Sequence, residues 1–191
     1  MDANDTRVYF DFTDPRSYLL EDWIESIRAE TGLDVSWIGL ELRPPPSPVL
    51  ATDAPEWHDR WEDARRMDSG GRLPTNPPPF APWTRKAHEL TLHAAEAHPD
   101  APIRRAILSS FFEEGADIGR VDVLVEIARG LGFDSTNTKA VLDVDKYEAD
   151  VAARAAEARD LGVTETPTIV YGSKQLTAFH DEEIVRTFLG T

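Results

Sequence analysis

The distribution of proline constrains the fold of this chain more than any other feature of its sequence. Ten of the 14 prolines lie between residues 44 and 82. Because proline fixes φ and has no backbone N–H, such a segment forms extended connections rather than a long helix or a central strand. A short helical stretch around residues 57–67 is the one interruption that the pattern predicts. Residues 44–83 are therefore expected to connect two parts with regular structure.

The first part, residues 1–43, has the pattern of a strand, a helix and a second strand. Residues 8–12 are β-branched and aromatic and predict a buried strand. Asp14 is suited to cap a helix and Pro15 to occupy its first turn, while Gly32 is placed to end it. Residues 35–40 predict the next strand. We expect the two strands to pair in parallel, joined by a right-handed crossover.

The remainder of the chain predicts helices followed by a hairpin and a final helix. Apolar residues at helical spacing predict four helices within residues 84–161. Residues 168–171 and 175–177 read as a hairpin, and Asp181 as the cap of the last helix. This order indicates an α/β fold, thioredoxin-like, with an all-helical insertion. The expected thioredoxin-like domain comprises residues 1–43 and 162–191, and the insertion residues 84–161.

Composition excludes several classes of function. The sequence contains no cysteine, so it has no thiolate nucleophile and no Cys-ligated metal site. Its formal charge of −15 argues against nucleic acid and anionic membranes as partners. The first residues lack a signal-peptide pattern, and we expect a cytoplasmic protein. The five histidines form no His-Glu-x-x-His pattern, so we expect no metal site.

Four segments resemble the DsbA-like thioredoxin family, and its FrnE-like branch in particular. Residues 11–19, Asp-Phe-Thr-Asp-Pro-Arg-Ser-Tyr-Leu, resemble the family's active-site corner Asp-Phe-x-Cys-Pro-x-Cys-Tyr. Residues 40–44 resemble the segment after its second strand, and residues 106–134 its inserted helices. Residues 158–169 resemble the stretch around its cis-proline. The resemblance runs from about residue 7 to residue 190 and implies a DsbA-like fold from a disulfide oxidoreductase family.

The resemblance places Asp14 and Ser17 at the positions of the family's two cysteines. Thiol–disulfide exchange requires attack by a thiolate, which neither side chain supplies. We therefore expect no redox activity, and whether any other catalysis remains is left open. Asp14 and Ser17 are the candidate catalytic residues. The competing interpretation is that Asp14 only caps its helix and that Ser17 is a locally bonded hydroxyl.

The resemblance also identifies candidate ligand-binding residues. In thioredoxin-like folds, the residue before the cis-proline presents its backbone to a bound peptide or to glutathione. Thr166 and Pro167 stand at that place, and we expect a cis bond between them, although Pro167 could instead open an edge strand with a trans bond. Pro15 borders the same cleft, and His180 could reach an anionic ligand there or serve only as a turn residue. The expected ligand is a small molecule or an extended peptide.

Two other functions remain open at this point. The corner is also similar to that of the 2-hydroxychromene-2-carboxylate isomerases and kappa-class glutathione transferases, which have a serine where Asp14 stands. This similarity implies a glutathione-dependent isomerase or transferase, with glutathione as a possible cofactor, although the leading interpretation requires none. The other possibility is a non-catalytic interaction module that recruits a partner through its proline-rich segment. The sequence leaves the oligomeric state open.

Overall fold

The computed structural model describes residues 6–51, 53–99, 101–177 and 179–191. Its main sheet has the strand order β2-β1-β5-β6, formed by Thr6–Phe10 (β1), Val35–Gly39 (β2), Thr168–Tyr171 (β5) and Lys174–Leu176 (β6). Strand β1 pairs in parallel with β2 and antiparallel with β5, and β5 and β6 form an antiparallel hairpin. The predicted strands, their parallel pair and the hairpin are confirmed.

Helix α1 (Pro15–Thr31) begins and ends at the residues that the sequence indicated. The Asp14 carboxylate accepts a hydrogen bond from the backbone N–H of Arg16, and Pro15 occupies the first turn. Gly32 has a φ of 69° and donates its N–H to the Arg28 carbonyl, so it closes the helix in the left-handed conformation that glycine tolerates. Asp181 caps α8 (Glu182–Leu189) in a similar way, by accepting from Ile184 N–H.

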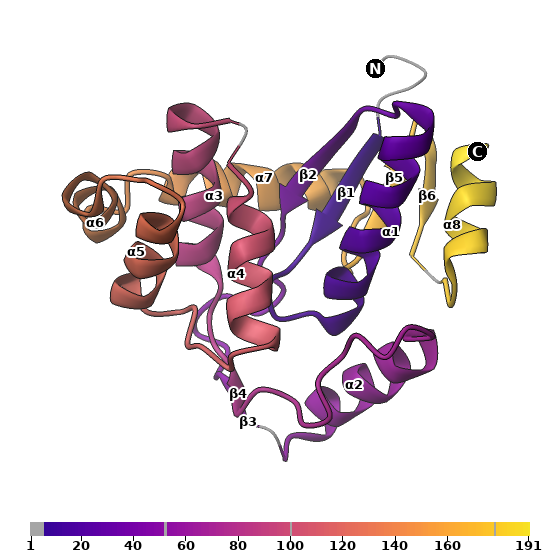
Figure 1. The fold of residues 1–191 in the computed structure, drawn as a ribbon, viewed down its shortest axis with the longest axis horizontal. Coiled ribbons are helices and arrows are strands. Elements are labelled where there is room, and N and C mark those ends of the chain that lie inside the picture. Colours follow the sequence, from indigo (N-terminus) through magenta and orange to yellow (C-terminus); the bar gives the residue numbers. More distant parts are fainter. Residues whose placement is uncertain (1–5, 52, 100, 178) are drawn as a thin grey trace.

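The proline-rich connection folds back over one end of the sheet. It contains α2 (Pro55–Met67) and two short strands, β3 (Leu50–Ala51) and β4 (Phe80–Ala81), which pair with each other and which the sequence did not predict. Figure 1 shows α2 below the lower end of α1, at the end of the sheet where β1 leads into that helix. Trp57 and Trp61 of α2 are buried, so this helix is packed into the molecule.

Five helices form the helical lobe, residues 85–160. They are α3 (Arg85–Ala97), α4 (Ile103–Phe112), α5 (Val121–Gly130), α6 (Ser135–Asp143) and α7 (Glu148–Asp160). The sequence predicted four helices here, and α6 is the one that was missed. Its sequence, STNTKAVLD, is rich in residues of low helix propensity. The overlooked signal was Asp134, whose carboxylate caps α6 by accepting from Asn137 N–H.

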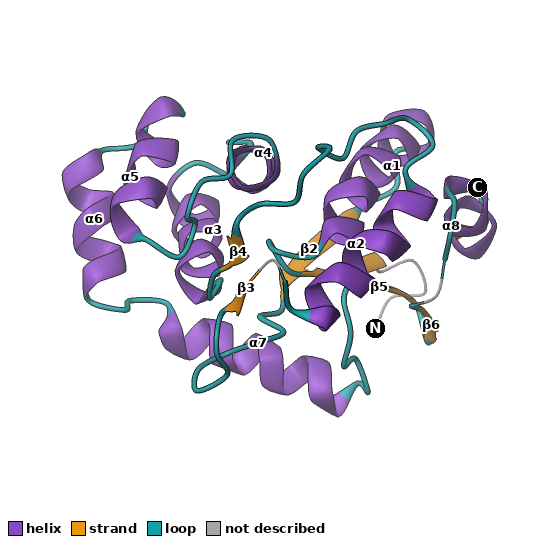
Figure 2. Cartoon of the chain, turned by 90° about the horizontal axis from the view of Figure 1, so that it is seen from below, coloured by secondary structure: helices purple, strands orange, loops and turns teal. Residues whose placement is uncertain are grey.

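The sheet lies between helices on both faces, which Figure 2 shows from below. On one face, α1 and α8 pack on Val8, Phe10 and Ile169 in a large core that continues into α3, α4 and α5. On the other face, Ala158 of α7 belongs to a smaller core with Tyr9, Leu40, Val163 and Val170. Within the described ranges, no helix has both the length and the apolar character needed to cross a membrane.

Candidate functional site

The strand–helix corner, residues 11–19, buries its two candidate catalytic residues. Asp14 is 2% exposed and Ser17 is fully buried. The Ser17 hydroxyl donates to Asp14 Oδ2 at 2.9 Å, and Arg16 N–H donates to Asp14 Oδ1 at 3.3 Å. The structure therefore brings Asp14 and Ser17 together, and it shows Asp14 as the helix cap of the competing interpretation. Both side chains are engaged with their own helix.

Two arginines balance the charge of this carboxylate. Arg16 Nε lies 3.7 Å and Arg60 Nη1 lies 3.9 Å from Asp14 Oδ1. Burial raises the pKa of Asp14 above its ordinary value of 3.8, and Arg16, Arg60 and the Ser17 hydroxyl oppose that shift. Arg60 belongs to α2, so this contact ties the proline-rich connection to the corner.

The Thr166–Pro167 segment lies beside the corner, as the order of the chain suggested. The peptide bond before Pro167 is cis, and both residues are buried. The Thr166 carbonyl accepts a hydrogen bond from Arg16 Nη2 at 2.5 Å. Arg16 thus links Asp14 to Thr166, two residues that are 152 positions apart. A ligand that paired with this carbonyl would have to share it with Arg16 or displace Arg16.

The expected open cleft at Asp14 is not what the structure shows. The space beside Asp14, bounded by Trp57, Arg60 and Ala81 among others, is about 10 Å³. That is roughly the volume needed for one water molecule. The reason is the proline-rich connection, whose buried aromatic and apolar side chains fill this end of the sheet. Pro15 is buried there as well.

An open cavity of about 490 Å³ lies next to the corner instead. It is lined by Arg16, Asp63, Arg66, Met67, Phe179 and His180. His180 is exposed and lines this cavity. Sequence reasoning missed Arg16 and Arg66. Arg16 stands within the corner motif between Asp14 and Ser17, which was the available signal, whereas Arg66 reaches the cavity only because α2 folds back.

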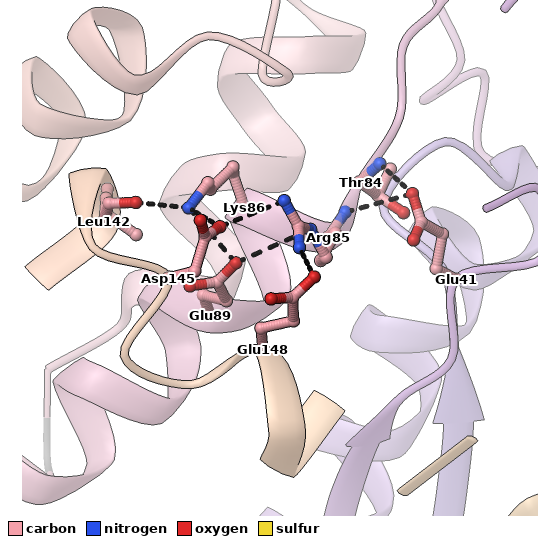
Figure 3. A network of polar contacts seen from close by, with 8 residues as sticks. All are labelled: Glu41, Thr84, Arg85, Lys86, Glu89, Leu142, Asp145 and Glu148. Atoms are coloured by element: carbon pink, nitrogen blue, oxygen red, sulfur yellow. Dashed lines mark hydrogen bonds and ion pairs between the residues drawn. The ribbon is translucent and has the colours of Figure 1, made fainter. Parts of the chain in front are cut away.

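A second polar cluster joins the helical lobe to the segment after β2 (Figure 3). Glu41 Oε1 accepts hydrogen bonds from the backbone N–H groups of Thr84 and Arg85, at 2.9 and 3.2 Å. Lys86 Nζ contacts Asp145 Oδ1 at 2.6 Å and lies 3.3 Å from the fully buried Glu89. These contacts hold the first turn of α3 between the thioredoxin-like part and the α6–α7 turn.

A buried acid and a histidine extend this interface toward the corner. His88 Nε2 lies 3.5 Å from Asp11 Oδ1, and both side chains are almost fully buried. The pKa of Asp11 lies below its ordinary value: burial raises it, but the contacts with His88 and the hydrogen bond that Leu42 N–H donates to Asp11 Oδ2 at 2.9 Å together outweigh burial. The Phe10 and Phe12 rings pack against His88. This arrangement leaves the pair inside the structure rather than at a cavity wall.

The fold, the corner motif and the cis bond before Pro167 all have counterparts in one family. The profile of the DSBA-like thioredoxin domain matches residues 6–189. The chain belongs to the DSBA-like thioredoxin family. Its sequence has no cysteine at the corner or elsewhere, so thiol–disulfide exchange is not available to it.

Known proteins similar to this DsbA-like chain cover nearly its whole length. The uncharacterized protein YwbO of Bacillus subtilis (strain 168) is 26% identical over 174 residues, which are 87% of this chain and 86% of YwbO. The probable DsbA oxidoreductase SCO1869 of Streptomyces coelicolor has a TM-score of 0.81 at 21% identity, with 97% and 88% of the two chains covered. A 2-hydroxychromene-2-carboxylate isomerase has a TM-score of 0.75 at 18% identity, with coverage of 97% and 94%. The two solved structures share the fold.

Proposed function

We propose that this protein is a non-redox member of its family that binds a small organic anion in the cavity beside the corner. Arg16 is the observation that carries the proposal: it lines the cavity and also contacts both Asp14 and the Thr166 carbonyl. Arg66, which is paired with Asp63 in the same wall, and His180 supply further donors at this cavity. A bound carboxylate would thus meet charged donors next to the family's active-site position.

The arrangement favours a small molecule over an extended peptide. Peptide pairing would use the Thr166 backbone, but Thr166 is fully buried and its carbonyl already accepts from Arg16. The cavity volume of about 490 Å³ lies within the range of small-molecule sites. Local positive charge also matters here, because a chain with a formal charge of −15 repels anions at long range. Binding should therefore depend on the side chains of this cavity.

Calorimetry with matched variants tests the proposal. Succinate, S-methylglutathione and the peptide trialanine serve as a dicarboxylate, a larger anion and an extended peptide. We expect at least one of the two anions to bind more tightly than trialanine. The double variant Arg66→Gln/His180→Gln should lose about tenfold in affinity, since a charged hydrogen bond contributes roughly 1.5–3 kcal/mol.

Arg159→Gln is the control, because Arg159 is exposed on α7 and does not line this cavity. It removes one positive charge and should leave the affinity unchanged. The proposal fails if neither anion binds at millimolar concentration, or if the cavity variant and the control lose affinity equally. Tighter binding of trialanine than of both anions would favour the peptide ligand.

The second candidate is a glutathione-dependent isomerase or transferase. The similarity in fold to the 2-hydroxychromene-2-carboxylate isomerase supports it. The buried carboxylate of Asp14 opposes it, because a thiolate placed beside Asp14 would meet a like charge. Comparing glutathione with S-methylglutathione separates the two candidates. Equal affinities for glutathione and S-methylglutathione indicate an anion site that does not contact the thiol. A strong preference for glutathione indicates thiolate chemistry.

A further inference from the structure

A second large cavity lies away from the corner, between the helical lobe and the edge of the sheet. Its volume is about 610 Å³, and its walls come from α1, β2, α3, the start of α4, and α7. Figure 1 shows these helices around β2, the edge strand of the sheet. It has no lining residue in common with the cavity beside the corner. Any ligand bound here would occupy a separate site.

Positive charge exceeds negative charge in the walls of this interlobe cavity. Four arginines, Arg28, Arg104, Arg105 and Arg154, face two glutamates, Glu21 and Glu25. Three of the arginines are already paired with carboxylates of α1: Arg28 with Glu25, Arg104 with Glu21 and Glu25, and Arg105 with Asp22.

Arg154 is the arginine that these pairings leave over. Among the described residues it makes no ion pair within 4.0 Å; burial lowers the pKa of its guanidinium, and the carboxylates of Asp150 and Glu157, on the same helix, partly oppose that shift. A half-buried guanidinium without a fixed partner is a site for an external anion. Because the other three arginines are held in ion pairs, Arg154 is the arginine of this wall that can turn to a ligand's negative charge.

Another part of the lining combines an apolar surface with buried polar atoms. Trp37 and Val35 lie in this wall, and the Arg104 guanidinium stacks 4.1 Å from the centre of the Trp37 ring. Glu21 is 1% exposed, and its Oε2 has no hydrogen-bond partner in the described structure; the same is true of Trp37 Nε1, whereas Arg104 Nε lies 3.4 Å from Glu21 Oε1. Unpartnered polar atoms of this kind are rare in folded proteins. A donor and an acceptor on a ligand, or water that enters with it, would satisfy them after small side-chain movements.

We infer that the interlobe cavity binds a small monocarboxylate with an apolar, ring-sized body and a hydroxyl group. Arg154 takes the carboxylate, and the wall around Val35 and Trp37 takes the body. The hydroxyl, which both donates and accepts, turns toward Glu21 and Arg104. This site is additional to the anion site proposed beside the corner, and neither depends on the other.

Calorimetry with three related probes tests this site on the full chain. The probes are 3-phenyllactate, 3-phenylpropionate, which lacks the hydroxyl, and 3-phenylpropanol, which lacks the carboxylate. We expect 3-phenyllactate to bind most tightly and 3-phenylpropanol at least about tenfold more weakly. Arg154→Gln should remove that preference, because it should lower the affinity for 3-phenyllactate and for 3-phenylpropionate about tenfold.

Two variants locate the binding. Arg159→Gln makes the same charge change on the same helix but outside the cavity, and Arg66→Gln changes only the cavity beside the corner. Both should bind 3-phenyllactate as the unmodified chain does. The indole N–H signal of Trp37 in ¹H–¹⁵N spectra can be assigned because it is missing from the spectrum of Trp37→Phe. This signal should shift when the unmodified chain is titrated with 3-phenyllactate.

Three outcomes would overturn the inference. One is that neither carboxylate binds at millimolar concentration. Another is that Arg154→Gln binds 3-phenyllactate with unchanged affinity. The third is that Arg66→Gln, rather than Arg154→Gln, abolishes binding, which would place the probe beside the corner and support that proposal alone.

Discussion

At the scale of single residues, Asp14 makes two contributions to the fold with one side chain. Its carboxylate accepts from Arg16 N–H and the Ser17 hydroxyl, so it stabilises the start of α1. It does so while buried next to two arginines. The residue is therefore both a helix cap and a buried charge, and these two contributions respond differently to substitution and to pH.

Asp14→Ala should lower the free energy of unfolding by about 1 kcal/mol at neutral pH, because the helix loses its cap. Asp14→Asn keeps a capping oxygen and removes the titrating group. Urea denaturation followed by circular dichroism measures both. A loss in Asp14→Ala no larger than in Asp14→Asn would contradict the capping role.

The pH dependence of the same pair isolates the buried charge. The folded chain holds the Asp14 proton more tightly than the unfolded chain does, because burial raises the pKa above 3.8. The stability that Asp14 contributes is then greatest below that value and is lost as pH rises through the folded-state pKa. The unfolding free energy of the unmodified chain minus that of Asp14→Asn should fall as pH rises from about 3.8. A difference that rises with pH would show that the ionised form is favoured in the fold.

Position 39 must be glycine because the His88 ring leaves no room for a side chain there, and not because of its backbone angles. A Cβ at this position would lie 2.2 Å from His88 Nδ1. Gly39→Ala should therefore cost about 1–3 kcal/mol through overpacking, and the cost should shrink in a His88→Ala background. Gly130→Ala is the control, since nothing lies within 4 Å of its added Cβ. Equal effects of Gly39→Ala with and without His88 would contradict the proposed clash.

At the scale of elements, the sequence predicts helix ends well where the cap is local. Asp14, Gly32 and Asp181 lie next to the helices they cap, and all three predictions are confirmed. Helix α3 differs: Thr84 makes no side-chain cap, and Glu41, 43 residues away, accepts from its first N–H groups. That contact depends on tertiary structure, so no local pattern predicts it.

Glu41→Ala should lower the free energy of unfolding by about 1–2 kcal/mol, because two backbone N–H groups at the start of α3 lose their acceptor. Glu41→Gln keeps an acceptor oxygen and should recover a large part of this loss. Chemical denaturation of the three chains provides the comparison. An unchanged stability in Glu41→Ala would show that α3 begins without help from Glu41.

At the scale of the whole molecule, the proline-rich connection separates what the sequence predicts from what it cannot. The order of strands and helices was sufficient for the thioredoxin-like fold, and the spacing of Asp14 and Ser17 placed them together at the start of α1, as its cap and a residue of its first turn. The closed corner could not be predicted, because it depends on how α2 folds back and places Arg60 on Asp14. The same placement of α2 brings Arg66 and Met67 to the open cavity. The position of the cavity is thus a property of the assembled chain.

The central claim is that an anion binds in that cavity, and Met67 reports on it directly. The sequence has two methionines, Met1 and Met67, and Met67 lines the cavity. In ¹³C-methyl methionine spectra, titration with S-methylglutathione and, separately, with succinate should shift the Met67 signal for at least one of them. The shift should saturate and should weaken in Arg66→Gln/His180→Gln. A Met67 signal that stays unchanged at millimolar concentrations of both anions would contradict the claim.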